Sequence, residues 1–318
     1  MTASNHSIAL IFPGQGSQAV GMGKDLAEKY PVARRTFEEA DDALDYKLSQ
    51  VCFEGPEDQL RLTEITQPAI LTTSVAALRV IEAQMPKPRY VAGHSLGEYA
   101  AHVASGTFSF ADAVRTVRNR GKYMQQAVPV GVGAMAAILG MDLEKVAAVC
   151  EEAAQGEVCS PANINSPEQI VISGNTAAVE RAAKLADDRG AKRAKLLPVS
   201  APFHCALMKP AQDQLEADLD KLPMQKPVYP VACNVEADLV TDDLRARDTL
   251  LRQVTGSVKW DQCIHLLIAH GVQTFIEVGP GKVLCGLMRQ IDRSKNCLNV
   301  SDDTSLTKTL EALAQTPA

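Results

Sequence analysis

The chain has 318 residues, of which 46% are hydrophobic and 22% charged, a composition typical of globular proteins with one large or two smaller domains. The net charge of −6 argues against nucleic acid as the principal partner. No apolar run approaches the roughly 18 residues that span a bilayer, and the N-terminus lacks the basic and apolar regions of a secretory signal. The eight cysteines are scattered without C-x-x-C or zinc-ligand spacing, which favours reduced thiols in a cytoplasmic protein and no metal site.

Strands and helices are predicted to alternate in the first part of the chain. Apolar runs predict strands over residues 7–12 and 89–92. Helical patterns are found over residues 31–45, 67–84, 98–104 and 110–127. Pro31 and Pro68 are expected at the starts of two of these helices, where proline is well tolerated, and Ser109 is expected to cap another. This alternation indicates a mostly parallel α/β sheet.

The next stretch, residues 129–199, has a different order of elements. Strands are expected over residues 133–140, 158–164, 169–173 and 191–199, and helices over residues 142–154 and 176–189. Strand, helix, strand, strand, helix, strand is the order of a ferredoxin-like unit. We therefore expect a small subdomain here, inserted into the larger fold.

After residue 200 the α/β pattern resumes. Helices are expected near residues 207–221, 258–270 and 282–291, and strands near 228–234 and 273–278. The predicted fold is therefore α/β, with two parts. An α/β-hydrolase-like large subdomain with a parallel sheet covers residues 1–128 and 200–318, and a ferredoxin-like small subdomain covers residues 129–199.

A serine lies between two glycines in Gly93-His94-Ser95-Leu96-Gly97. A predicted strand precedes this segment and a predicted helix follows it. Strand, G-x-S-x-G and helix form the context of a nucleophile elbow, in which the flanking glycines permit a sharp turn that projects the serine hydroxyl. The helix would direct its N-terminal N–H groups toward an anion formed there. The alternative is an ordinary strand-to-helix turn whose serine caps the helix.

A serine nucleophile needs a base, and histidine is the usual one near neutral pH. His204 is the best candidate among the six histidines, because it lies in a loop between a predicted strand and a predicted helix. Such loops carry the catalytic groups of many α/β folds. Serine before histidine is also the order found in α/β-hydrolases. A histidine that caps the next helix is the alternative.

The glycine loop after the first strand has two possible uses. Gly14, Gly16 and Ala19 fit a relaxed dinucleotide-binding pattern, G-x-G-x-x-G/A. That pattern also needs an acidic residue at the end of a second strand, and the acids at the right spacing, Glu38 and Glu39, lie in a helical stretch. We therefore favour a loop that brings backbone N–H groups close to an oxyanion.

Five sequence blocks occur in order between residues 12 and 281. They are Phe12-Pro13-Gly14-Gln15-Gly16-Ser17-Gln18, Gly93-His94-Ser95-Leu96-Gly97-Glu98, Arg120-Gly121-Lys122-Tyr123-Met124, Ala201-Pro202-Phe203-His204 and Glu277-Val278-Gly279-Pro280-Gly281. Together they resemble the malonyl-CoA:acyl-carrier-protein transacylases of bacterial fatty-acid synthesis. They are similar also to the acyltransferase domains of polyketide and animal fatty-acid synthases. The resemblance covers nearly the whole chain.

This resemblance implies a two-step transfer through a serine ester. Ser95 would attack the thioester of malonyl-CoA, and His204 would deprotonate it and later activate the incoming thiol. The backbone N–H groups of Gln15 and Leu96 would form the oxyanion hole. A backbone carbonyl, which the match places at Gln253, would orient the histidine, because no aspartate occupies a recognisable triad position. The resemblance implies no cofactor and no metal.

Two further residues would select the acyl group. The guanidinium of Arg120 offers a bidentate match to the carboxylate that distinguishes malonyl from acetyl. From the residues alone, a solvated arginine on a helix face, like Arg115 and Arg118, is the alternative. Phe203 resembles the pocket residue of malonyl-type enzymes and would crowd a methyl group at C2.

The implied partner is the phosphopantetheine thiol of an acidic acyl carrier protein. Two basic clusters are candidate docking sites: Lys184, Arg189, Lys192, Arg193 and Lys195, and Arg289, Arg293 and Lys295. The sequence does not distinguish a carrier of fatty-acid synthesis from one of polyketide synthesis. The resemblance implies a monomer, and no nucleic-acid or membrane partner is expected. A serine hydrolase using the same residues is one alternative function, and a non-catalytic binding module is another.

Overall fold

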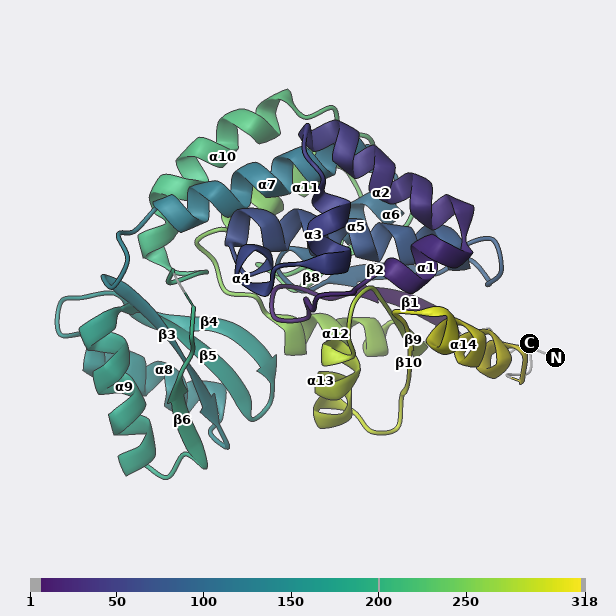
Figure 1. Ribbon diagram of the computed structural model, residues 1–318. Coiled ribbons are helices and arrows are strands. Elements are labelled where there is room, and N and C mark those ends of the chain that lie inside the picture. Colours follow the sequence, from purple (N-terminus) through teal and green to yellow (C-terminus); the bar gives the residue numbers. More distant parts are fainter. Residues whose placement is uncertain (1–6, 200, 316–318) are drawn as a thin grey trace.

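The computed structural model describes residues 7–199 and 201–315, and it contains two sheets, each with its own helices (Figure 1). The larger sheet has the strand order β10-β9-β1-β2-β7-β8. Its strands are β1 (Ser7–Phe12), β2 (Tyr90–Gly93), β7 (Val231–Cys233), β8 (Asp238–Val240), β9 (Val272–Val278) and β10 (Asn296–Val300). All neighbours are parallel except β7 and β8, which confirms the predicted α/β fold with a mainly parallel sheet.

Helices cover both faces of this sheet because its strands are apolar on both sides. In β1, Leu10 and Phe12 pack into one core and Ala9 and Ile11 into another. The first core includes α1 (Lys24–Lys29), α2 (Pro31–Leu44), α3 (Leu48–Glu54), α4 (Glu57–Leu60), α5 (Thr63–Ile81), α6 (Gly97–Ala104), α7 (Phe110–Gln126), α10 (Lys209–Lys221), α11 (Asp243–Arg252) and α14 (Asp303–Gln315). The second includes α12 (Trp260–Ala269) and α13 (Val283–Ile291).

The smaller sheet is antiparallel, with the order β4-β5-β3-β6. Its strands are β3 (Gly133–Leu139), β4 (Cys159–Ser166), β5 (Gln169–Asn175) and β6 (Arg193–Leu196), and α8 (Leu143–Ala154) and α9 (Thr176–Asp188) pack on it. Both the chain order and the sheet order are ferredoxin-like. β4 lies beside the segment before α12, because the N–H of Ile164 donates to the carbonyl of Val258 at 2.8 Å.

Several predicted boundaries are wrong. The helix expected from residue 67 begins at Thr63, so Pro68 lies inside α5 rather than at its start. A proline inside a helix removes one backbone hydrogen bond, but nearly all of α5 is buried, so tertiary packing outweighs this loss. The strands expected over 191–199 and 228–234 shorten to β6 and β7. The helical pattern predicted to resume near Met22 is α1, whereas β8, α11, β10, α14 and the short helices α3 and α4 were not predicted.

Candidate active site

Ser95 lies on a tight turn between β2 and α6, at the carboxyl end of the parallel strands. Its φ of 51° is in the left-handed region, which is the strained backbone expected of a nucleophile elbow. The turn packs directly on the end of β1, since a Cβ at Gly97 would lie 2.2 Å from the carbonyl oxygen of Phe12. Only glycine allows this approach, so the second glycine of the motif is what lets the turn pack against the end of β1.

His204 contacts the serine from the loop that follows β6. Its Nε2 lies 2.7 Å from Ser95 Oγ, and its Nδ1 lies 2.9 Å from the backbone carbonyl oxygen of Gln253. Because a carbonyl can only accept, Nδ1 carries the proton and Nε2 is free to accept one from the serine. Burial, assisted by the charge of Arg120, lowers the pKa of His204 to about 3. The imidazole is therefore neutral near pH 7, as a general base must be.

Arg120 on α7 is buried in the same site, with 1% of its surface exposed. One guanidinium nitrogen donates to Gln67 Oε1 at 2.7 Å; the other donates to Gln253 Oε1 at 2.9 Å and to Ser95 Oγ at 3.2 Å. Within residues 7–199 and 201–315, no aspartate or glutamate forms an ion pair with it. Its burial rules out the solvated helix-face alternative. A buried cation that meets only neutral partners is poised to bind an anion.

The glycine loop after β1 lies against the elbow. A Cβ at Gly14 would meet the carbonyl oxygen of His94 at 2.4 Å, so the loop and the turn are in direct contact. In the described part of the chain, the N–H groups of Gln15 and Leu96 have no hydrogen-bond acceptor, while that of Ser95 donates to Asn234 Oδ1 at 2.7 Å. The next helix, α1, begins only at Lys24, so this loop lacks the helix N-terminus on which a dinucleotide pyrophosphate would bind.

Three buried side chains of this network were not predicted from the sequence: Gln67, Glu98 and Asn234. Glu98 Oε2 accepts from the N–H of Asn234 at 2.9 Å and from Gln253 Nε2 at 2.7 Å. Burial raises the pKa of Glu98 to about 7, against the opposing effects of these hydrogen bonds and of Arg120. The sequence does contain a signal that could have identified Glu98, since it is an acidic residue at the start of an otherwise small and apolar helix.

A cavity of about 130 Å³ opens on the serine. Its walls include the apolar side chains Met124, Met135, Leu197, Val199 and Phe203. Ser95, His204 and Arg120 provide polar groups in it. The volume suits a small acyl group, and a lining that combines apolar walls with convergent polar groups is typical of ligand sites.

His94 does not contact the serine hydroxyl but ties the elbow to the small sheet. Its Nε2–H donates to Asn165 Oδ1 on β4 at 2.7 Å. His102, His265 and His270 have other partners, and His6 lies outside the described residues. Across the residues that the structure describes, no group of three or more His, Cys, Asp or Glu is placed to hold a metal ion. Nor is any described helix both long and apolar enough to cross a membrane.

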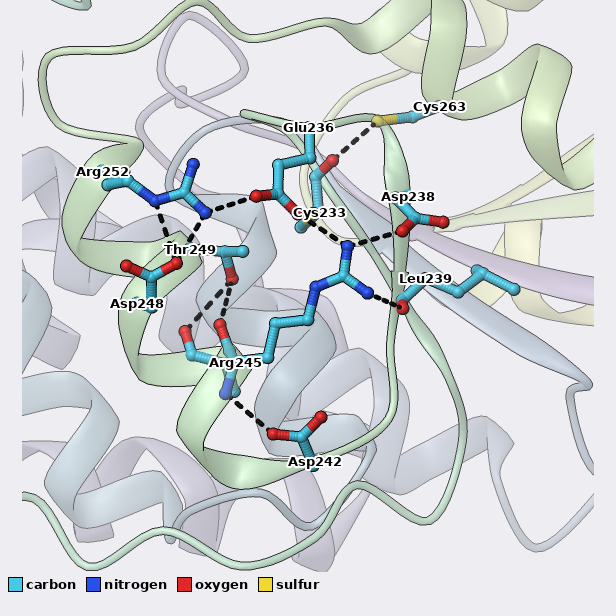
Figure 2. Close-up of polar contacts among 11 residues, drawn as sticks. Cys233, Glu236, Asp238, Leu239, Asp242, Arg245, Asp248, Thr249, Arg252 and Cys263 are labelled. Carbon is cyan, nitrogen blue, oxygen red and sulfur yellow. Dashed lines mark hydrogen bonds and ion pairs between the residues drawn. The ribbon is translucent and has the colours of Figure 1, made fainter.

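A second polar network lies nearer the surface, beside the segments that carry Asn234 and Gln253 (Figure 2). Glu236 pairs with two arginines of α11, with 2.6 Å to Arg245 and 2.5 Å to Arg252. Each arginine also has a second carboxylate partner, Asp238 for the first and Asp248 for the second. These ion pairs hold the β7–β8 turn against α11.

The α/β fold and the serine–histidine pair fit an acyl-transferring or hydrolytic enzyme, and the family match decides between these classes: the chain belongs to the acyl transferase domain family, whose model it matches over residues 9–309. A malonyl CoA-acyl carrier protein transacylase of Bacillus subtilis is 48% identical over 309 residues, which are 97% of this chain and 98% of that protein. The enzyme of the same description from Escherichia coli K12 is 49% identical over 304 residues, 95% of this chain and 98% of that protein. The resemblance found in the sequence is thereby confirmed.

Solved structures agree with this assignment. The malonyl CoA-acyl carrier protein transacylase of Coxiella burnetii superposes with a TM-score of 0.95 at 43% identity, covering 97% of this chain and 98% of that one. A malonyl-transacylase solved in complex with its type II polyketide acyl-carrier protein has a TM-score of 0.94 at 45% identity, with 96% and 99% covered. The α/β arrangement of a mainly parallel sheet with a separate antiparallel sheet is thus that of the family.

Proposed function

We propose that this acyltransferase moves a malonyl group from malonyl-CoA to the phosphopantetheine thiol of an acyl carrier protein. One observation carries the proposal: the buried guanidinium of Arg120, which has no carboxylate partner among the described residues, donates to the hydroxyl of Ser95, 3.2 Å away. A substrate carboxylate would complete this site, and acetyl would leave it incomplete. The names of the relatives support the same substrate pair.

In the first step, His204 Nε2 takes the proton of Ser95 as the serine oxygen attacks the thioester carbonyl. The N–H groups of Gln15 and Leu96 stabilise the oxyanion, and losing one such donor typically costs about 2.7–4 kcal/mol of barrier. The imidazolium then returns the proton to the departing sulfur, which leaves as the thiol of coenzyme A. Gln253 keeps the imidazole oriented throughout through its backbone carbonyl.

In the second step the carrier thiol replaces coenzyme A. His204 deprotonates it, the thiolate attacks the malonyl-serine ester, and the proton returns to Ser95 Oγ as the ester breaks. The two half-reactions form a ping-pong sequence, and every group they need comes from the chain and its two substrates. Water at the same position would make the protein a hydrolase, which is the competing function to be tested.

Selectivity follows from two side chains that line the cavity. Arg120 would bind the malonyl carboxylate with two N–H groups, a charged hydrogen bond worth about 1.5–3 kcal/mol. Phe203, which is only 8% exposed and lines the cavity, would crowd a methyl group at C2 and so disfavour methylmalonyl.

Of the two basic clusters, the one near β6 is the better docking site for an acidic carrier. Two of its members, Arg189 and Lys192, are already paired with acidic side chains. Arg193 and Lys195 are exposed on β6, and that strand leads directly to Leu197 in the cavity wall. We expect the rate of association with carrier to fall with added salt. At one salt concentration, Lys195→Glu should lower this rate more than Arg293→Glu does. A rate independent of salt would refute steering by either cluster.

The decisive test of the function is intact mass after incubation with malonyl-CoA. The wild type should gain one malonyl group, and Ser95→Ala should gain none. Addition of a phosphopantetheinylated carrier should then remove the group from the enzyme and place it on the carrier. Absence of any adduct under rapid acid quench would indicate a binding module, and free malonate released equally fast without carrier would indicate a hydrolase.

A further inference from the structure

One buried carboxyl group beneath the site has no part in these steps. Glu98 follows Gly97 in α6 and is completely buried. Its Oε2 accepts two hydrogen bonds, but in the described part of the chain its Oε1 has no partner. An ionised carboxylate with one oxygen unsatisfied is poorly compensated at such depth. The site therefore holds an acid whose charge is easily removed.

Gln253 connects this acid to the reacting groups. Its amide nitrogen donates to Glu98 Oε2 at 2.7 Å and its amide oxygen accepts from Arg120 at 2.9 Å. Its backbone oxygen accepts from His204 at 2.9 Å. The carboxyl of Glu98 accepts, so it holds the amide with its NH₂ group inward and its oxygen toward Arg120. A rotated amide would point two N–H donors at the guanidinium, which can only donate.

We propose, resting on the function proposed above, that Glu98 is a positioning residue for malonyl transfer and that its carboxyl takes up a proton from solvent when a malonyl group binds at Arg120. Without substrate, the positive charge of Arg120 is offset by the negative charge of ionised Glu98, and the side chain of Gln253 bridges the two groups. Binding of a malonyl carboxylate would leave two anions and one cation in a buried site. Protonation of Glu98 restores neutrality, and release of the acyl group returns the proton to solvent.

The surroundings of Glu98 leave it as the group that changes charge near neutral pH. Burial raises its pKa to about 7. Burial also raises the pKa of Tyr99 to about 12, that of Cys233 to about 11, and that of Cys263 well above its usual value. Arg120 remains a cation, although burial lowers its pKa. His204, with a pKa of about 3, stays neutral over the same range.

The test is the rate of the first half-reaction, in which no carrier thiol takes part. Loading of Ser95 is followed by rapid quench and intact mass at about pH 6 and about pH 8. We expect the concentration of malonyl-CoA giving half-maximal loading to rise on the order of tenfold over this range. That is the effect expected from repulsion between the malonyl carboxylate and an ionised Glu98, taken as two like charges about 10 Å apart at an effective dielectric constant of about 20. Acetyl-CoA, which has no carboxylate, should show no such rise.

Glu98→Gln keeps a side-chain oxygen for Asn234 and Gln253 but cannot ionise, so its half-saturation should not change with pH. Glu98→Ala should in addition load more slowly at every pH, because the amide of Gln253 loses its anchor. Glu277→Gln is the matched control: Glu277 is also completely buried, but it accepts from the N–H groups of Leu284 and Cys285 at the start of α13. It should keep the wild-type pH dependence.

A second measurement does not depend on folding of the Glu98 variants. Calorimetric titration of malonyl-CoA into Ser95→Ala, in two buffers of different ionisation enthalpy, should report uptake of about half a proton near pH 7. Titration of acetyl-CoA should report none. Equal uptake for both ligands, or a Glu98→Gln enzyme that keeps the wild-type pH dependence, overturns this inference. If the wild type forms no malonyl adduct at all, it is the proposed function that has failed.

Discussion

Two polar networks lie near the segments that carry Asn234 and Gln253, an inner one that is buried at Ser95 and an outer one nearer the surface, and they differ in what their arginines contact. On the outer side, Arg245 and Arg252 each pair with two carboxylates. On the inner side, Arg120 donates to amide and hydroxyl oxygens and lies over the ring of Tyr99, and no carboxylate among the described residues pairs with it. The outer charges are partly solvated and locally neutralised, which suits a structural role. The inner charge is desolvated and not neutralised by direct contact, which suits a role in binding.

The largest effect should come from removing the inner base. His204→Ala should slow loading of Ser95 by about 10²- to 10⁴-fold, the usual contribution of general base catalysis. Stopped-flow or quench kinetics with malonyl-CoA measures this. His265→Ala is the control, since its side chain is about half exposed on α12, where it pairs with Asp261. Equal loss in both variants would mean that stability, and not proton transfer, limits the rate.

Removing the inner cation should affect one substrate more than another. Arg120→Ala should reduce malonyl loading about 10- to 100-fold more than acetyl loading, which corresponds to one charged hydrogen-bond pair. Arg120→Lys should recover only part of this, because an ammonium cannot reach Gln67, Gln253 and a carboxylate in one plane. Arg115→Ala, at an exposed position on the same helix, is the control. An equal loss for both acyl groups would refute the carboxylate role.

These residues differ in how far the sequence could identify them. The residues of the elbow are close in sequence: Gly93, Ser95 and Gly97 lie within five positions, so a short sequence pattern is enough to predict the turn. His204 could be proposed because its loop follows a strand and precedes a helix. Its contact with Ser95 spans 109 positions, and spacing alone does not reveal such a contact.

The remaining part of the network carries no pattern of its own. Gln67 and Asn234 are ordinary amides in sequence, and their roles depend on which long-range partners the fold brings to them. The backbone carbonyl of Gln253 came from the resemblance, whereas its side-chain contacts with Arg120 and Glu98 appear only in the structure. The same holds for α5, where burial overrides the local signal of Pro68. Packing between distant segments decides what short patterns leave open.

Buried histidines near the inner network should set the acid stability. Burial lowers the pKa of both His102 and His204 to about 3. Between about pH 6.5 and about pH 3 the unfolded chain binds these protons and the folded chain does not, so stability is lost as the pH falls through this range. Each histidine adds about 1.4 kcal/mol per pH unit to the slope. The free energy of unfolding of His102→Gln can be measured in urea at about pH 5 and about pH 7. It should depend on pH less steeply than that of the wild type, by the contribution of one histidine.

Glu98 should act in the opposite sense on stability. Its pKa in the folded state is raised to about 7, so the folded chain retains a proton that the unfolded chain has lost. Its contribution is present below about pH 4.5 and is lost as the pH rises to about 7. Glu98→Gln should remove this decline. If the free energy of unfolding of Glu98→Gln follows the same pH dependence as that of the wild type between about pH 5 and about pH 7, Glu98 is ionised throughout this range.

The smallest effect should come from the outer network. Glu236→Gln weakens the pairs with Arg245 and Arg252 (Figure 2), and partly exposed pairs contribute only about 0.2–1 kcal/mol each. Urea unfolding should therefore show a loss of about 1 kcal/mol, reduced further by salt. Loading of Ser95 should stay within about twofold of wild type, because Glu98 still holds Asn234 and Gln253 from inside. A much larger loss of rate at full stability would mean that the outer arginines also position Gln253, and the division between a structural outer network and a functional inner one would fail.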